Sequence, residues 1–232
     1  MKKNYTHIIL IFLSLVFFRF SLIGQTNTQG SIELDNRIYN GKYYNYFLPK
    51  SVYGNQFLSK KESSLGIVWK KGVEFDGLLL NYDVLNQQVL LEFTTNEGAA
   101  RLISLSMVDV DSFYFENKKF VIDTNISQLG DIYQCIYYKG IKLYFYYSKI
   151  LTLQSKLNDI EYHFNKLDKD IFYYENGNYH KVKKNSKFIK KLNPKIANNV
   201  KHYMKSKKYK LNKMNDEQYL DILVYIKDKA IE

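Results

Sequence analysis

The sequence predicts an α+β protein: mainly antiparallel β structure, in a sandwich or a partly open barrel, followed by a β-hairpin and two or three C-terminal helices. Three observations predict this class. Short apolar and β-branched runs alternate with Gly, Asn and Asp from Ile32 to Leu153, without helical periodicity. An Asn-Gly dipeptide at Asn176 separates two aromatic runs. After Asn193 the apolar residues recur at helical spacing.

The composition is that of a globular protein with one basic segment. Of 232 residues, 46% are hydrophobic and 25% charged, and the formal net charge is +11. Residues 181–213 hold 13 Lys and no acid, whereas residues 25–180 carry a net charge of −2. The single cysteine, Cys135, excludes an intramolecular disulfide framework and a metal site made of cysteines alone.

Residues 1–24 are expected to be a secretory signal peptide. A basic start precedes the largely apolar run Ile8–Phe18, whose eleven residues are too few to span a bilayer. Cleavage before Gln25 would leave an exported product with no membrane span, in the periplasm, at the outer-membrane periphery or outside the cell. An uncleaved N-terminal anchor is the alternative.

The remaining chain is expected to form two regions. Residues 25–155 are predicted to be an antiparallel β-rich domain, and residues 156–232 a β-hairpin plus a basic helical C-terminal region. Within the first region, the apolar runs that predict strands are Leu65–Trp69, Leu78–Tyr82, Val89–Phe93, Arg101–Leu105, Val108–Phe115 and Phe120–Ile122.

A hairpin is predicted over residues 131–148, with Lys139-Gly140 as its two-residue turn. This turn would pair Tyr138 with Ile141, Ile136 with Leu143, and Ile132 with Tyr147, on a face that we expect to be core. The opposite face would carry Cys135 together with four tyrosines: Tyr133, Tyr137, Tyr144 and Tyr146. These rings are either a binding platform or a covered part of the core with hydroxyls at its rim.

A second hairpin is marked by Asn176-Gly177, which joins Ile171–Glu175 to Asn178–Val182. A type I′ turn requires positive φ angles at both central residues, and Asn-Gly accepts them at little cost.

Helices follow this hairpin. A short helical turn is expected at Lys187–Leu192, and Asn193-Pro194 is a cap followed by proline at the first helical position. One apolar stripe is then formed by Ile196, Val200, Tyr203 and Met204.

The last helix begins near Asn215, with acids in its first turn and lysines in its last, which matches the helix dipole. Its expected apolar set is Tyr219, Leu220, Leu223, Val224 and Ile226.

Two stretches carry a resemblance. The first runs from Gly54 to Leu58, then through Trp69, Gly72, Val73 and Gly77 to the Tyr82-Asp83 pair. The second runs from Phe172 through Asn176-Gly177 and the basic helices to Tyr219–Ile226. In these features the chain resembles an uncharacterised family of exported β-rich proteins common in Bacteroidetes. The resemblance implies export and a β-rich scaffold, and it supplies no catalytic residues.

The sequence contains none of the common nucleophile, phosphate-loop or dinucleotide motifs. Cys135 lies in an apolar strand with no histidine near it in sequence, so we expect an inert thiol. His163, His180 and His202 include no closely spaced pair of the kind that anchors zinc. We therefore predict no catalytic residue, no metal and no cofactor.

Asp109 and Asp111 are the one carboxylate pair that suggests chemistry. On a regular strand they would share a face, with Cα atoms about 6.6 Å apart, within the range of paired glycosidase carboxylates. They support an alternative function, a glycan-binding or glycan-processing protein of the envelope. A solvated polar face and a weak cation site are the other interpretations.

The lysine tract of residues 181–213 has three interpretations: a solvated helix surface, a site for nucleic acid, or a contact with anionic lipid headgroups, lipopolysaccharide or an acidic polysaccharide. Export and the lack of arginine in the tract argue against nucleic acid. The residues chosen as candidate contacts are Lys201, Lys205, Lys207 and Lys208.

Together these features predict an exported, non-enzymatic envelope protein with a binding or scaffolding role. Its expected partner is an anionic envelope surface or polysaccharide, or another envelope protein.

Overall fold

A computed structural model describes residues 35–46, 48–95, 97–127, 130–156 and 159–228. The chain divides into Met1–Leu34 and a compact unit, Asp35–Glu232, and only the second unit is described below. The expected signal peptide, residues 1–24, lies outside the described residues.

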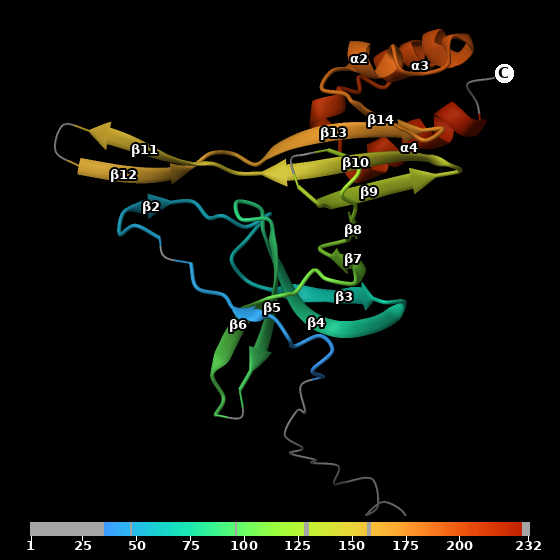
Figure 1. Ribbon diagram of the computed structural model, residues 1–232. Coiled ribbons are helices and arrows are strands. Elements are labelled where there is room, and N and C mark those ends of the chain that lie inside the picture. Colours follow the sequence, from blue (N-terminus) through green and yellow to red (C-terminus); the bar gives the residue numbers. More distant parts are fainter. Residues whose placement is uncertain (1–34, 47, 96, 128–129, 157–158, 229–232) are drawn as a thin grey trace, which may run out of the picture. The chain divides into compact units, whose positions relative to one another are not determined.

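Among the described residues, eleven strands form one large sheet, in the order β1-β6-β5-β4-β3-β7-β8-β9-β10-β13-β14, and every neighbouring pair is antiparallel (Figure 1). The strands of this sheet are β1 (Lys42–Tyr43), β3 (Ser64–Lys70), β4 (Val73–Asp83), β5 (Gln88–Thr94), β6 (Ala100–Ser104), β7 (Val110–Phe115), β8 (Lys118–Ile122), β9 (Ile132–Tyr138), β10 (Ile141–Ser148), β13 (Asp168–Glu175) and β14 (Asn178–Lys181). The sheet is open, because β1 and β14 end it without pairing to each other.

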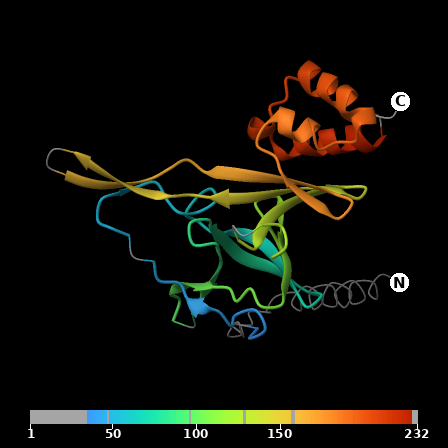
Figure 2. The same ribbon diagram turned by 45° about the horizontal axis from the view of Figure 1, so that its top comes forward.

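A small second sheet has the order β11-β12-β2, in which β12 and β2 are parallel. Its strands are β2 (Val52–Tyr53), β11 (Leu151–Lys156) and β12 (Asp159–Phe164). Strands β11 and β12 continue the β10–β13 pair as a two-stranded ribbon (Figures 1 and 2). The expected boundary at residue 155 therefore falls within this hairpin.

The two predicted hairpins are present in the expected registers. In β9–β10, Tyr138 faces Ile141 and Ile136 faces Leu143. The turn residues Lys139 and Gly140 have φ angles of 40° and 87°, as a type I′ turn requires. The Asn176-Gly177 turn between β13 and β14 has φ angles of 50° and 82°.

Three helices and one 3-10 turn follow the sheet. They are α2 (Asn185–Ile189), α3 (Pro194–Ser206), η1 (Leu211–Lys213) and α4 (Asp216–Asp228). The side chain of Asn193 caps α3 by accepting a hydrogen bond from the Lys195 backbone N–H at 3.0 Å. Three members of the predicted stripe, Ile196, Val200 and Met204, are buried, whereas the fourth, Tyr203, is only half-buried.

Helix α4 buries a stripe that differs from the expected set at three positions, because Leu220 and Val224 are not buried and Ile222 is. Ile222 is fully buried, whereas Leu220 is 42% exposed. The reason is the helical period of 3.6 residues, which places positions three and four apart on one face and Leu220 on another. The buried stripe of α4 is Tyr219, Ile222, Leu223 and Ile226.

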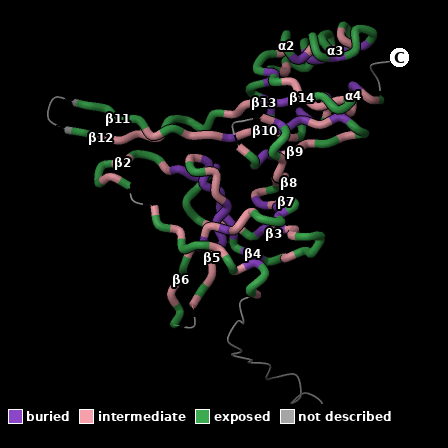
Figure 3. The backbone as a smooth tube through the Cα atoms, in the orientation of Figure 1, coloured by how far each residue is buried: buried purple, intermediate pink, exposed green. Residues whose placement is uncertain are grey.

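Helix α4 packs on β9 and β10, and α3 packs on both α2 and α4. Figure 2 shows the three helices gathered beside the same part of the sheet. One hydrophobic core joins these helices to strands β3–β10 and β13, and it appears as purple segments in Figure 3. The α+β class and the mainly antiparallel, open, sandwich-like β structure predicted from the sequence are thus confirmed. Within the described part of the chain, no helix combines the length and the apolar character needed to cross a bilayer.

Candidate functional site

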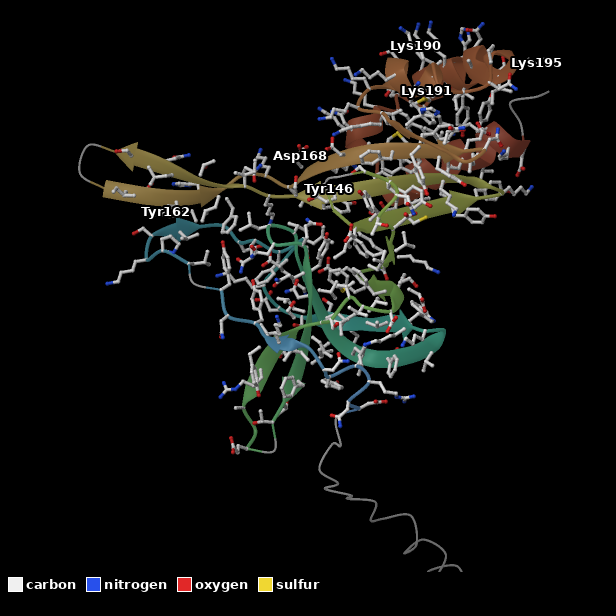
Figure 4. The ribbon with its side chains drawn as sticks, viewed as in Figure 1. Tyr146, Tyr162, Asp168, Lys190, Lys191 and Lys195 are labelled. Carbon is white, nitrogen blue, oxygen red and sulfur yellow. The ribbon has the colours of Figure 1, made fainter. Side chains whose placement is uncertain are left out.

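The helical region encloses a cavity of about 420 Å³, which we call the lysine groove. Its lining comes from α2, from the C-terminal half of α3 and from the segment after α3. The lining residues are Asn185, Ile189, Lys201, Met204, Lys205, Lys208, Tyr209 and Lys210. Figure 4 shows nitrogen-tipped side chains around α2 and α3, where Lys190 and Lys195 are labelled.

Helical spacing brings the groove lysines together. Lys201, Lys205 and Lys208 follow one another at intervals of four and three residues, which places them along one side of α3 and its C-terminal turn. All three are exposed, while Met204, one residue before Lys205, is buried in the core. The groove therefore borders the buried stripe of α3.

The chain leaves α3 through a Schellman motif. The Tyr209 N–H donates to the Met204 carbonyl at 2.8 Å, and the Lys208 N–H donates to the Lys205 carbonyl at 3.1 Å. Lys208 has φ = 56° and is therefore left-handed. Glycine is the usual residue at this position of a Schellman motif. The motif turns the backbone so that Lys208, Tyr209 and Lys210 line the groove.

Two side chains fix the wall of the groove. Asn185 donates from Nδ2 to the Tyr209 carbonyl at 2.7 Å, and its Oδ1 accepts from the Leu211 N–H at 2.8 Å. The Tyr209 hydroxyl donates to Asp221 Oδ2 on α4 at 3.0 Å. The segment after α3 is thus tied to both α2 and α4.

A neighbouring tyrosine strengthens the link between α3 and α4. The Tyr203 hydroxyl donates to the same Asp221 oxygen at 2.7 Å, and its ring stacks on Tyr225 with centroids 3.9 Å apart. Desolvation raises the pKa of Tyr203, and the hydrogen bond to Asp221 raises it further. Tyr203 therefore remains a neutral hydrogen-bond donor at physiological pH.

The charge of the groove is not compensated locally. Among the residues that the structure describes, none of Lys201, Lys205, Lys208 and Lys210 forms an ion pair. The groove therefore presents four ammonium groups and no carboxylate in its lining.

The start of the lysine tract is different. Lys181 Nζ and Lys183 Nζ lie 2.7 and 3.1 Å from the two carboxylate oxygens of Asp170. Partial burial disfavours ionisation of Asp170, but the hydrogen bonds from both lysines outweigh it and lower the pKa of this carboxyl group. Lys181 and Lys183 are therefore paired with a carboxylate of the sheet, whereas the groove lysines form no ion pair with a described residue.

The structure brings three of the four predicted contact lysines together. Lys201, Lys205 and Lys208 line the groove, and Lys210 joins them. Lys207 is also exposed but lies outside the lining, with its Nζ 5.8 Å from the centroid of the Tyr203 ring.

The tyrosine face of the β9–β10 hairpin is largely covered. Tyr133 and Tyr144 are 0% and 3% exposed, Tyr146 is half-buried, and only Tyr137 is well exposed, at 57%. Ile126, from the connection between β8 and β9, packs among them. The four rings therefore do not form one flat exposed platform.

This aromatic cluster is held by ring contacts. Tyr133 meets Phe172 and Tyr144 edge-on, with centroids 5.9 and 6.4 Å apart. Burial raises the pKa of the neighbouring Cys135 thiol to about 11, and the nearby Lys142 only partly offsets this. The thiol is accordingly protonated at neutral pH, as expected for an inert cysteine.

Asp109 and Asp111 hold a turn. Asp109 Oδ2 lies 2.8 Å from Lys71 Nζ, and Asp111 Oδ2 accepts the Gly72 N–H at 2.8 Å. Both contacts stabilise the turn between β3 and β4. Asp109 has φ = 63° and precedes β7, so the alternation expected for two carboxylates on one regular strand begins only at Val110.

The histidines lie apart from one another. His163 stacks on Tyr53 with centroids 4.7 Å apart and lies 3.1 Å from Glu161 Oε2. His180 is opposite Tyr173 in the β13–β14 pair, and His202 is exposed on α3. Across the described ranges, no group of three His, Cys, Asp or Glu side chains is arranged to hold a metal ion.

A larger cavity, of about 610 Å³, lies beside the start of α4 and was not predicted from the sequence. Lys118 Nζ lies 2.5 Å from Asp216 Oδ2, and Gln134 Nε2 donates to the same oxygen at 2.8 Å. The Tyr147 hydroxyl donates in turn to Gln134 Oε1. These strand residues come from β8, β9 and β10, so the network joins the sheet to α4.

Lys169, half-buried on β13, completes this network. Its Nζ lies 4.9 Å from the centroid of the Tyr219 ring and donates to the Met214 carbonyl at 3.3 Å. Burial lowers the pKa of Lys169, against the opposing effect of Asp216. This cavity is lined by charges of both signs, including the Lys118–Asp216 ion pair, whereas the charged residues in the lining of the lysine groove are all lysines.

The apolar lining of the groove was not predicted from the sequence. Ile189, Met204 and Tyr209 lie among the lysines. Part of the signal was available, since Lys201 and Lys205 directly follow the apolar stripe positions Val200 and Met204. The approach of α2 to the end of α3 depends on tertiary contacts that no local pattern encodes.

Comparison of the chain with protein-family models, with curated proteins and with solved structures finds no match, so its function is argued from its own geometry.

Proposed function

We propose that this chain is an exported, non-enzymatic protein of the cell envelope that binds an anionic partner through the lysine groove. The observation that carries the proposal is the set of four exposed lysines without ion-pair partners among the described residues, gathered around one cavity of about 420 Å³. Export to the periplasm, the outer-membrane periphery or the cell exterior is part of the proposal, and it rests on the sequence of residues 1–24.

Electrostatics favours this role. Clustered charges of one sign raise the local concentration of oppositely charged partners and speed their association. Lysine ammonium groups act as mobile point charges, without the fixed bidentate geometry of arginine. The groove is thus suited to phosphate, sulfate or carboxylate groups presented in variable arrangements.

The composition of the lining supports binding over catalysis. Besides the lysines, it contains Asn185, Ile189, Met204 and Tyr209, and no carboxylate, imidazole or thiol. A general acid–base mechanism is usually built from such groups, placed within hydrogen-bond reach of one another.

The test is retention on immobilised heparin, a polyanion, measured as the salt concentration needed for elution. The variant Lys201→Gln/Lys205→Gln/Lys208→Gln/Lys210→Gln removes the four ammonium groups. We expect its elution to shift to markedly lower salt, because each lost contact weakens a screened electrostatic attraction.

The matched control replaces four exposed lysines outside the groove, Lys42, Lys50, Lys60 and Lys61, with Gln. This variant loses the same net charge and should elute close to the unmodified protein. Equal elution of the two variants would overturn the proposal, because net charge rather than the groove would then govern binding.

A further inference from the structure

We infer that the partner of the lysine groove is an anionic lipid, with its headgroup at the lysines and part of an acyl chain over the apolar floor. This inference rests on the proposed function and deepens it, because the apolar floor of the groove favours a lipid over other anionic partners.

The floor is hydrocarbon. Ile189 is half-buried and Met204 is almost fully buried, and both line the groove. Tyr209 contributes its ring, while its hydroxyl is bonded to Asp221 on α4. An unbranched Met side chain adapts to irregular apolar partners such as acyl chains.

The polar atoms of the non-lysine lining are already used. The side-chain oxygen and nitrogen of Asn185 bond to the backbone of Leu211 and Tyr209. A polysaccharide lying in the groove would bury hydroxyl groups against this floor with few partners, which costs free energy. An acyl chain has no hydrogen bonds to lose there.

The lysines themselves fit the boundary between headgroup and chain. A lysine side chain lays its methylene stem along apolar surface and keeps its ammonium group in water. Lys201, Lys205 and Lys208 stand at the edge of the apolar floor. Phosphate groups of a lipid headgroup would therefore meet the ammonium groups while the chain meets the stems and the floor.

The Schellman motif fixes the position of one groove lysine. Lys208 occupies its left-handed position, at φ = 56°, where a side chain is less favourable than glycine. This conformation places Lys208 in the lining of the groove.

The experiment compares two soluble probes by isothermal titration calorimetry: dioctanoyl phosphatidylglycerol below its critical micelle concentration, and glycerophosphoglycerol, its headgroup without chains. We expect the lipid to bind at least about tenfold more tightly, since burial of two methylene groups is worth roughly that factor. Dihexanoyl phosphatidylglycerol should fall between them.

A groove-filling variant, Ile189→Trp, should abolish the advantage of the lipid over its headgroup. Equal affinity of lipid and headgroup, with heparin retention still dependent on the groove lysines, would overturn the inference and leave the proposed function standing. The comparison of the headgroup with the dihexanoyl and dioctanoyl lipids uses the unmodified protein. It therefore tests whether the acyl chain contributes to binding even if the Ile189→Trp variant does not fold. Loss of lysine dependence for heparin would instead overturn the proposed function.

Discussion

At the scale of single residues, Lys208 combines a left-handed backbone with a place in the groove lining. Its left-handed φ of 56° is part of the Schellman motif that ends α3, and its side chain lines the lysine groove. A left-handed conformation costs an L-residue about 1–2 kcal/mol relative to its favoured conformations, and glycine is spared most of that cost.

Lys208→Gly should therefore raise the free energy of unfolding by about 1 kcal/mol, measured by urea denaturation, and lower the salt concentration that elutes the protein from heparin. Lys207→Gly is the matched control, because Lys207 is helical, with φ = −79°. That variant should be destabilised, by up to about 1 kcal/mol. A loss of stability for Lys208→Gly as large as that for Lys207→Gly would contradict the claim that the backbone is strained at Lys208.

Residue-scale inference from the sequence succeeded where chemistry is local. The Asn193 cap, the Asn176-Gly177 turn and the half-buried Cys135 follow from the residue type and its immediate sequence context. It was less successful at Asp109, whose positive φ, beside a register shift between β3 and β7, interrupts the expected strand alternation.

At the scale of elements, the lysine tract serves two purposes. Lys181, at the end of β14, and Lys183 pair with Asp170 on β13 and hold the edge of the sheet. The four lysines Lys201, Lys205, Lys208 and Lys210 have no such partner among the described residues and line the groove. One run of basic sequence thus divides into lysines paired with a carboxylate of the sheet and lysines that line the groove.

Asp170→Asn should lower the free energy of unfolding at pH 7 by about 1–2 kcal/mol, through loss of a charge-assisted hydrogen-bond pair. The folded-state pKa of Asp170 lies below the ordinary value of 3.8, so its stabilisation is complete above that value and is lost as the pH falls through the folded pKa. The difference between the variant and the unmodified protein should therefore shrink in acid.

Thermal denaturation from pH 7 to pH 3 measures this difference. Asp168→Asn, on the same strand but exposed and bonded only to the backbone N–H of Lys169, is the control. A difference at Asp170 that stays constant down to pH 3 would contradict the ion-pair account.

Strands with local partners were predictable, and those with distant partners were not. The β9–β10 and β13–β14 hairpins were readable from two-residue turns and alternation. The pairing of β12 with β2 joins residues more than a hundred positions apart, and no local pattern specifies it. The burial of Tyr133 and Tyr144 likewise depends on Ile126 and Phe172, which pack against them from other elements.

At the scale of the whole unit, Asp35–Glu232, two surfaces could meet a lipid. One is the lysine groove, and the other is the ribbon of β11 and β12, where no described residue is buried and Leu153 and Ile160 are 54% and 60% exposed (Figure 3). The ribbon offers apolar side chains without clustered lysines. The lysine groove combines apolar side chains with clustered lysines, so we assign the anionic lipid to the groove.

The most direct test is a map of backbone amide chemical shifts by NMR during titration with dioctanoyl phosphatidylglycerol. The account predicts saturable shifts at Ile189, Lys205 and Tyr209, with the amides of Leu153 and Ile160 unchanged. Shifts confined to Leu153 and Ile160, or none at the groove at saturating lipid, would contradict it.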